Sequence, residues 1–303
     1  MNSIQLRLSN LICRNVFKVM YKFSHPKAYK HNRRYWPYYQ VERNEHGGID
    51  KVYFKNKLIS DNSFVPEQNH PKCMLVTTGP SVKSIPTAAF TRTDVDYMGV
   101  NGAISLAHTD FKYYVIIDHN FTENRFDLVQ KALQRCQVFF TTPRCLDLIL
   151  RKLDPSEIPC KIRVIEPITD GKIERFMGPR VDANVNYEHF YFDLVQSKGF
   201  AKHIHNAVFD YFTVAYVALQ IIHQLEYSNI YLAGLDMNNF NQPRFYEQSG
   251  NKQPTMLDYY LQDEILPAFE TAACFLKQQN VQVHNFSFES AVNAFTKLDP
   301  AHF

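Results

Sequence analysis

From residue 73 onward, short apolar runs alternate along the chain with stretches in which apolar residues recur at helical spacing. The apolar runs predict strands at residues 74–77, 97–100, 113–117, 137–140, 161–165, 229–232 and 281–285. The helical spacing predicts helices at residues 126–135, 143–153, 209–225 and 257–279. Such alternation is typical of helices packed on both faces of a parallel sheet. The sequence therefore predicts an α/β fold with a single doubly wound, mostly parallel, Rossmann-like sheet in residues 73–303.

Two segments do not follow this alternation. Residues 1–72 precede it, and within them an alternating pattern at residues 47–54 predicts a small hairpin. We interpret residues 1–72 as an N-terminal extension that wraps on the domain of residues 73–303. Residues 170–198 are rich in turn-forming and aromatic residues without a clear period, and we expect them to pass over the functional edge of the sheet.

Basic residues gather at the N-terminus. The whole chain has 33 Lys and Arg against 30 Asp and Glu, yet residues 1–34 contain eight basic residues and no acidic one. Between these cations, apolar residues recur at roughly helical spacing: Ile4, Leu8, Leu11, Ile12, Val16, Val19, Met20 and Phe23. The pattern predicts an amphipathic helix on an anionic membrane surface. A helix packed on the body with solvated cations stays open as an alternative; a nucleic-acid partner is not expected, because the body has no RNA-binding signature.

Composition sets the class of protein. Of the 303 residues, 45% are hydrophobic and 21% are charged, which is enough for a full core. There is no run of 18 uncharged apolar residues, and Arg14 and Lys18 interrupt any signal-peptide core. The six cysteines form no C-x-x-C pair, so we expect reduced thiols in a cytoplasm.

Polar residues directly follow several of the predicted strands. The first strand runs into Thr77-Thr78-Gly79-Pro80-Ser81, the second into Asn101-Gly102, the third into Asp118-His119-Asn120 and the sixth into Gly234-Leu235-Asp236. Ligands of open parallel sheets bind beyond the carboxyl ends of the strands. A glycine permits close backbone approach there, and a helix N-terminus attracts phosphate. The sequence therefore predicts a shared small-molecule site at this edge.

Two motifs resemble metal sites. Asp94-Val95-Asp96 has the D-x-D pattern of many nucleotide-sugar transferases, but it precedes a predicted strand and so belongs at the opposite edge of the sheet. We interpret it as a charged turn. His203 and His205 could ligate a metal, but they have no third ligand at helical spacing. We therefore expect no metal site and no cofactor.

The order and spacing of several segments resemble the bacterial sialyltransferase-like glycosyltransferases that use CMP-activated ulosonic acids. The similarity is greatest to the lipopolysaccharide core Kdo-III transferases of the WaaZ type, and it extends over roughly residues 73–295. It is carried by Gly79-Pro80-Ser81, Val100-Asn101-Gly102, Gly199-Phe200 with Lys202, residues 213–227, Gly234-Leu235-Asp236, Arg244-Phe245-Tyr246-Glu247 and Gly250-Asn251.

The resemblance implies a GT-A-like variant of the Rossmann fold and a set of site residues. The cytidine nucleotide of the donor would be held by Thr78, Gly79, Pro80, Ser81, Asn101 and Gly102, with Asp118 near the ribose or sugar and Thr213 near cytosine and phosphate. Tyr246 would place its hydroxyl on the leaving phosphate. Hydroxyls and amides that stabilise a departing CMP substitute for a metal ion, so the donor is a CMP-sugar and no metal is implied.

The catalytic base is where this sequence departs from the family. Its sialyltransferases use a histidine between the tyrosine region and the last long helix, whereas residues 247–283 contain no histidine. Carboxylates of that window or near it are the candidates: Asp236, Asp258, Asp263 and Glu264.

The resulting hypothesis is an inverting, metal-independent glycosyltransferase that moves Kdo, or a related ulosonic acid, from its CMP donor to an inner-core sugar of lipopolysaccharide or lipooligosaccharide. Residues 1–34 would hold it on the inner face of the bacterial inner membrane as a peripheral cytoplasmic protein. The alternatives are a sialyltransferase that uses CMP-sialic acid, a catalytically inactive nucleotide-binding protein of envelope assembly, and a membrane-surface scaffold. Assembly into a homo-oligomer is also left open.

Overall fold

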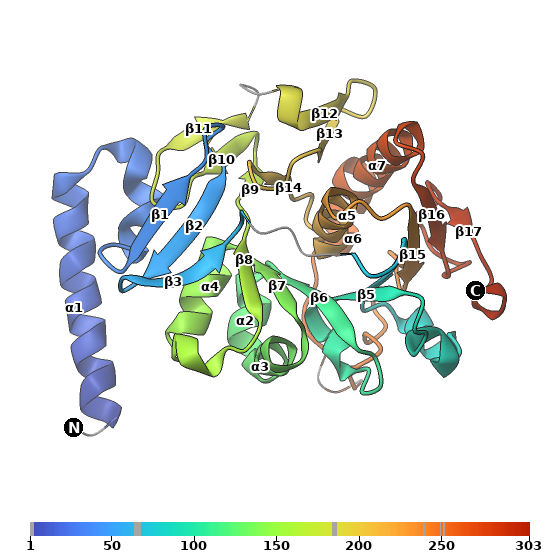
Figure 1. Ribbon diagram of the computed structural model, residues 1–303, viewed down its shortest axis with the longest axis horizontal. Helices are drawn as coiled ribbons and strands as arrows, with labels where there is room; N and C mark the ends of the chain where they lie inside the picture. The colour runs from blue at the N-terminus through green and yellow to red at the C-terminus, as the bar shows by residue number, and fades with distance from the viewer. Residues whose placement is uncertain (1–2, 64–67, 184–186, 239, 249, 251) are drawn as a thin grey trace.

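An eleven-stranded, mostly parallel sheet runs through the computed structural model, which describes residues 3–63, 68–183, 187–238, 240–248, 250 and 252–303 and, of residues 3–13 and 187, the backbone alone. The strand order is β1-β2-β3-β8-β7-β6-β5-β4-β15-β16-β17 (Figure 1). The central parallel strands are β4 (Lys72–Val76), β5 (Asp96–Val100), β6 (Phe111–Ile116), β7 (Val138–Thr141), β8 (Lys161–Val164), β15 (Asn229–Ala233) and β16 (Gln282–Asn285). Each of the seven strands predicted from the sequence is confirmed within one or two residues.

Helices cover both faces of the sheet. Leu75, Met98 and Val115 pack in one core with α5 (Val214–Gln224) and α7 (Leu266–Gln278). Their neighbours in the chain, Met74 and Tyr114 among them, pack in a second core that contains α3 (Phe126–Arg135) and part of α4 (Pro143–Leu150). Successive strand residues point to opposite faces, so the apolar runs are buried on both sides and the doubly wound arrangement is confirmed.

Two predicted helices differ from the observed ones. The helix expected at residues 209–225 begins only at Val214, because residues 208 and 209 pair as strand β14 (Val208–Phe209). The helix expected at residues 257–279 consists of α6 (Leu257–Tyr260), a π-helical turn (Leu261–Ile265) and α7. Local apolar spacing continues through both irregularities, so it does not reveal them.

The N-terminal hairpin extends the main sheet and does not wrap over it. Strands β1 (Tyr39–Arg43), β2 (Ile49–Phe54) and β3 (Lys57–Asp61) pair antiparallel, and β3 then pairs parallel with β8 through Ser60 and Ile162. The expectation of a wrapped hairpin is therefore wrong, since its strands and those of the α/β domain share one hydrogen-bonded sheet (Figure 1).

The segment 170–198 forms short strands, in contrast to its irregular pattern. Strands β9 (Pro167–Thr169), β10 (Lys172–Glu174), β11 (Arg180–Asp182) and β14 make a second small sheet, and β12 (Phe190–Asp193) pairs with β13 (Lys198–Ala201). These strands are two to four residues long, which is too short for a periodic signal.

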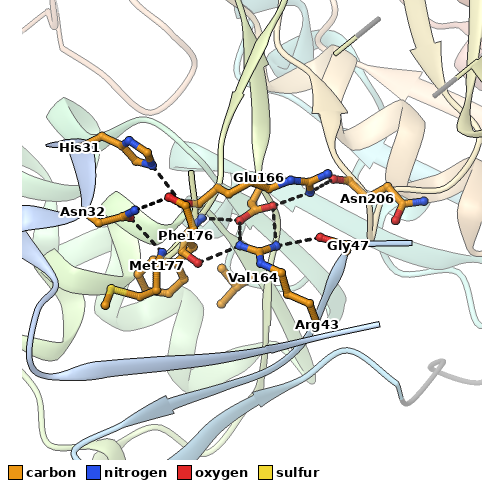
Figure 2. Close-up of polar contacts among 12 residues, drawn as sticks. His31, Asn32, Arg43, Gly47, Val164, Glu166, Phe176, Met177 and Asn206 are labelled. Carbon is orange, nitrogen blue, oxygen red and sulfur yellow. Dashed lines mark hydrogen bonds and ion pairs between the residues drawn. The ribbon is translucent and has the colours of Figure 1, made fainter. Parts of the chain in front are cut away.

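A buried carboxylate joins this segment to the N-terminal strands (Figure 2). Glu166, just after β8, has a side chain with no exposed surface and accepts two hydrogen bonds from Arg43 of β1, at 2.7 and 3.1 Å. Arg175 donates a third hydrogen bond to Glu166 at 2.8 Å, and the Phe176 amide donates a fourth. Arg43 also donates to the carbonyls of Gly47 and Phe176, at 2.9 and 2.8 Å. The charge of Glu166 is thus neutralised by residues from both sides of the junction.

Helix α1 (Ser3–Ser24) stands at one end of the sheet beside the N-terminal strands (Figure 1). One face packs on the body: Tyr21 is buried, and the Phe17 ring lies edge-on to Trp36 with centroids 5.6 Å apart. A different face exposes an apolar stripe of Val16, Val19, Met20 and Phe23, with exposed fractions of 52, 57, 51 and 84%. The predicted helix is confirmed; the side chains of Ile4, Leu8, Leu11 and Ile12 lie outside the described residues. Within the described part of the chain, every helix is too short or too polar to span a bilayer.

Candidate active site

A cavity of about 520 Å³ opens at the carboxyl ends of β4, β5, β6 and β15, opposite the first turn of α5. This volume is in the range of small-molecule sites. Seven of the residues predicted from the sequence line the cavity: Thr78, Gly79, Pro80, Asn101, Asp118, Thr213 and Asp236. The described residues of the segment 170–198, which are 170–183 and 187–198, contribute nothing to the lining, so the expectation that the segment covers the functional edge is wrong for this part of it.

Asp236 fixes the turn after β4. Its carboxylate accepts a hydrogen bond from the backbone amide of Ser81 at 2.9 Å and another from the Ser81 hydroxyl. Gly79 donates its amide to the carbonyl of Gly234 at 3.0 Å, and a Cβ on Gly79 would lie 2.3 Å from that carbonyl oxygen. The turns after β4 and β15 therefore approach each other to a distance that only glycine permits. Ser81 donates to Asp236 and is not among the residues that line the cavity.

Asn101 lines the cavity and carries a buried polar atom without a described partner. It directly follows β5 with a φ of +46°, in the left-handed region that few residues other than glycine adopt. Its backbone carbonyl accepts the Tyr114 hydroxyl at 2.7 Å. Its side-chain oxygen, Oδ1, is buried and has no hydrogen-bond partner among the residues that the structure describes. A buried acceptor without a donor costs free energy. A ligand that donates a hydrogen bond to this oxygen would remove the cost.

Asp118 and His119 lie where β6 meets helix α2 (His119–Asn124). Asp118 is exposed and caps the helix by accepting the amide of Asn120 at 2.8 Å. His119 lines the cavity, and burial together with the nearby Arg144 lowers its pKa, an effect that Asp118 opposes. At neutral pH this imidazole is therefore predominantly neutral and able to accept a proton.

Tyr246 lies against the turn after β5 but not in the cavity lining. A Cβ on Gly102 would lie 2.1 Å from the Tyr246 ring, so the glycine lets the ring rest on the backbone. The guanidinium of Arg125 sits over the other part of the ring, 5.5 Å from its centroid. Burial raises the pKa of Tyr246 to about 12 against the opposing effect of Arg244, so the hydroxyl keeps its proton and can donate it.

Three carboxylates proposed as bases from the sequence lie outside the cavity. Asp258 and Asp263 are exposed, and Glu264 forms an ion pair with Lys198 at 3.0 Å. None of the three lines the cavity. Asp258 belongs to α6, and Asp263 and Glu264 belong to the π-helical turn.

Sequence reasoning missed a carboxylate that does line the cavity. Asp210 lies in the loop between β14 and α5. Burial raises its pKa to about 6, with Asp118 adding to the increase and a hydrogen bond from the Phe212 amide opposing it. Because the sequence pattern placed residues 209–225 in one helix, Asp210 was not recognised as following a strand.

An aromatic pair forms the wall beside Asp210. Phe212 has a φ of +60°, which is rare for an aromatic residue. This conformation directs its ring onto Tyr260, with the two planes 2° from parallel and the centroids 3.5 Å apart. Tyr260 is the last residue of α6, immediately before the π-helical turn. Both residues line the cavity.

The first turn of α5 offers backbone amides to the cavity. Thr213, the residue before the helix, is buried and does not cap it with its side chain. Val214 and Ala215 of that first turn line the cavity. Amides of a first helical turn have no partner within the helix, and the helix dipole favours an anion beside them. The arrangement therefore suits a phosphate or a carboxylate.

The two acidic residues of the D-x-D motif have other partners. Asp94 forms ion pairs with Lys72 at 2.8 Å and with Arg92 at 2.9 Å. Asp96 is buried, pairs with Lys112 at 3.1 Å and accepts the Tyr227 hydroxyl. The interpretation of a charged turn at the other edge of the sheet is confirmed. Nowhere in the described part of the chain, His203 and His205 included, do three or more His, Cys, Asp or Glu side chains converge as metal ligands would.

Comparisons with known proteins support the resemblance seen in the sequence. Residues 194–296 match the family described as 3-deoxy-D-manno-octulosonic acid transferase WaaZ. A probable 3-deoxy-manno-octulosonic acid transferase from Salmonella typhimurium is 32% identical over 97 residues, which are 31% of this chain. The chain spans about a third (34%) of the length of that curated relative.

Several solved structures of bacterial glycosyltransferases are also similar. The sialyltransferase CstII from Campylobacter jejuni is 13% identical, with a TM-score of 0.42 and coverage of 76% of this chain and 86% of that chain. The monofunctional α-2,3-sialyltransferase Cst-I from the same organism is 13% identical, with a TM-score of 0.43 and coverage of 80 and 85%. The MAf glycosyltransferase from Magnetospirillum magneticum is 11% identical, with a TM-score of 0.44 and coverage of 78 and 35%.

Proposed function

We propose that this chain is a glycosyltransferase that moves Kdo, or a related ulosonic acid, from a CMP donor to an inner-core sugar of lipopolysaccharide or lipooligosaccharide. The observation that carries the proposal is the cavity itself, with the unpartnered Asn101 oxygen on one side and the uncapped first turn of α5 on the other. The WaaZ match supports it, because residues 194–296 include α5, β15 and the loop that form one half of the cavity wall.

The donor fits this cavity chemically. The buried Oδ1 of Asn101 accepts from a cytosine amino group or a ribose hydroxyl. The amides at the start of α5 bind the phosphate or the ulosonic carboxylate. We place the Tyr246 hydroxyl near the leaving phosphate, where it donates a hydrogen bond as charge develops.

The proposed reaction inverts the anomeric centre and needs no metal. An acceptor hydroxyl oxygen attacks the anomeric carbon of the ulosonic acid while the bond from that carbon to the phosphate oxygen breaks. The hydroxyl proton passes to a base of the protein, and CMP leaves with the electron pair as a phosphate monoester. The transition state resembles an oxocarbenium ion, which hydrogen bonds to the departing phosphate stabilise.

We further propose that α1 holds the enzyme on the cytoplasmic face of the inner membrane. Its exposed stripe of Val16, Val19, Met20 and Phe23 provides apolar surface for the acyl boundary. Lys18, Lys22 and Lys27 lie along the same segment and provide the attraction to anionic lipid.

A transfer assay tests the function. The purified full chain is incubated with CMP-Kdo, generated in the reaction because it hydrolyses quickly, and with a Kdo-containing core lipid. Mass spectrometry should show the lipid gaining one Kdo residue, equally with and without EDTA. Loss of transfer with EDTA would overturn metal independence. Transfer from CMP-sialic acid alone would identify a sialyltransferase, and CMP binding without any transfer would identify an inactive nucleotide-binding protein.

A further inference from the structure

Three carboxylates face the cavity, and they differ in what already occupies their oxygens. Asp236 accepts from both the amide and the hydroxyl of Ser81. Asp118 is exposed and accepts the amide of Asn120. Asp210 accepts only the backbone amide of Phe212 among its described neighbours. Asp210 is therefore the carboxylate of the three that is partly buried and still has free acceptor capacity.

The backbone on either side of Asp210 is held in place. Before it, Gln220 of α5 accepts the amide of Phe209 at 3.0 Å and donates to the Phe209 carbonyl at 2.8 Å. After it, the Tyr211 hydroxyl accepts the amide of Gly199 at 2.7 Å, and the Phe212 ring is stacked on Tyr260. These contacts anchor the residues on both sides of Asp210 and so restrict its backbone, as the positioning of a proton-transfer group requires.

The strained backbone at Phe212 is a second indication that this loop serves a ligand. A positive φ at an aromatic residue costs free energy that the surrounding structure must offset. Its local result is that the Phe212 ring lies on Tyr260, and both aromatic residues line the same cavity as Asp210. An apolar wall of this kind disfavours the charged form of a nearby carboxylate and makes it a stronger base.

We propose that Asp210 is the general base of the transfer reaction, accepting the proton of the acceptor hydroxyl as its oxygen attacks the anomeric carbon. This inference rests on the proposed function. Asp210 would take the role of the catalytic histidine that residues 247–283 lack. The carboxylates of that segment are less suited to this role, because they lie outside the cavity lining. The other charged and titratable residues that line the described cavity are Asp118, His119 and Asp236 from the strand ends, Arg244 and Lys252 from the loop after β15, and Tyr260 of α6.

The test compares Asp210→Asn with the wild-type chain over a range of pH. The kcat of the wild type is expected to rise with pH through about 6, because the carboxylate must be ionised to accept a proton. Asp210→Asn should lower kcat at pH 8 by at least about 100-fold and remove this rise, while KM for CMP-Kdo changes by less than about threefold. If CMP raises the Tm of the variant by as much as it raises the Tm of the wild type, the variant is folded and binds nucleotide.

Three further variants separate the rivals. Glu270→Gln removes an exposed carboxylate on α7 and should leave both kcat and its pH dependence unchanged. The proposal is overturned if Asp210→Asn keeps the rise in kcat near pH 6, or if His119→Gln or Asp263→Asn removes that rise in its place. If the wild type transfers the sugar and Asp210→Asn is fully active as well, the base assignment is overturned and the proposed function is not. Absence of transfer by the wild type from either CMP donor overturns the base assignment and the proposed function together.

Discussion

Asn101 combines a strained backbone with an unsatisfied side chain, and both features matter at the level of the single residue. We predict that Asn101→Gly raises the Kd for CMP by at least about tenfold, because the buried acceptor is lost. The free energy of unfolding should stay the same or rise by up to about 1 kcal/mol, since glycine adopts a positive φ without strain. Calorimetric titration with CMP and chemical denaturation measure the two effects.

Asn280 supplies the matched control for this substitution. It is exposed at the end of α7 and has a φ of +58°, so Asn280→Gly makes the same chemical change far from the cavity. Its affinity for CMP should equal that of the wild type. Equal losses of affinity in the two variants would contradict the assignment of Asn101 to the nucleotide.

The pKa of Asp210 also predicts how stability depends on pH. Because burial raises this pKa from its ordinary 3.8 to about 6, the folded chain holds the proton more tightly than the unfolded chain between these two values. The contribution of Asp210 to stability is then greatest below about pH 4, falls as the pH rises through about 6 and is absent above it. Asp210→Asn should consequently be more stable than the wild type at pH 8, by at most about 3 kcal/mol. Thermal unfolding at pH 5 and pH 8 measures the difference, and a less stable variant at pH 8 would contradict it.

The sequence predicts site residues where a clear strand ends in a polar residue. Asn101 and Asp118 were found in this way, because residues 97–100 and 113–117 form uninterrupted runs without charge and their ends are sharp. Asp210 follows β14, which is only two residues long and pairs with β9 of the small sheet. No local pattern marks so short a strand, and the apolar residues around Asp210 continue the spacing of α5. The base candidate could therefore be recognised only from the tertiary structure.

At the level of elements, α1 has two apolar faces and one of them is free. We predict that the double variant Val19→Asp/Phe23→Asp weakens binding to vesicles that contain phosphatidylglycerol by at least about tenfold, because charge is placed in the surface that enters the lipid. The helix should remain docked, since Phe17 and Tyr21 form its other face. Vesicle co-sedimentation measures the binding, with circular dichroism to follow the helix.

The control lies on another exposed apolar pair. Leu194 and Val195 are 91 and 89% exposed, in the turn between β12 and β13. Leu194→Asp/Val195→Asp adds the same two charges away from α1 and should leave vesicle binding unchanged. If this variant reduces binding as much as the α1 variant does, the membrane-facing surface is not α1.

At the level of the whole molecule, Glu166 is the junction between the N-terminal strands and the rest of the chain (Figure 2). We predict that Arg43→Ala lowers the free energy of unfolding by about 3 to 5 kcal/mol, because a buried carboxylate loses its bidentate partner. Arg180→Ala, which removes an exposed ion pair with Glu174, should cost no more than about 1 kcal/mol. Urea denaturation of both variants measures the difference, and equal effects would show that Glu166 is not the junction.

The joining of the N-terminal strands to the sheet was beyond sequence analysis for a related reason. β3 has the sequence Lys-Leu-Ile-Ser-Asp, with one fully buried residue, Ser60. Ser60 contacts β8 about a hundred residues later, where its hydroxyl accepts the amide of Val164 at 3.2 Å. A polar strand of this kind has no hydrophobic face from which its partner could be inferred. The buried central strands, by contrast, can be recognised as strands of a parallel sheet from their apolar composition.

The π-helical turn that follows Tyr260 makes the cavity wall depend on the number of residues in a helix. A π turn holds one residue more than an α turn, so deletion of the exposed Gln262 would let the segment Leu261–Ile265 close into a continuous α-helix with α7. The residues before the deletion would then turn by about 100° around the helix axis. Tyr260 would leave the Phe212 ring, and the wall beside Asp210 would open to water. A change in the length of this turn would thus alter the environment of Asp210, although no side chain of the cavity had been replaced.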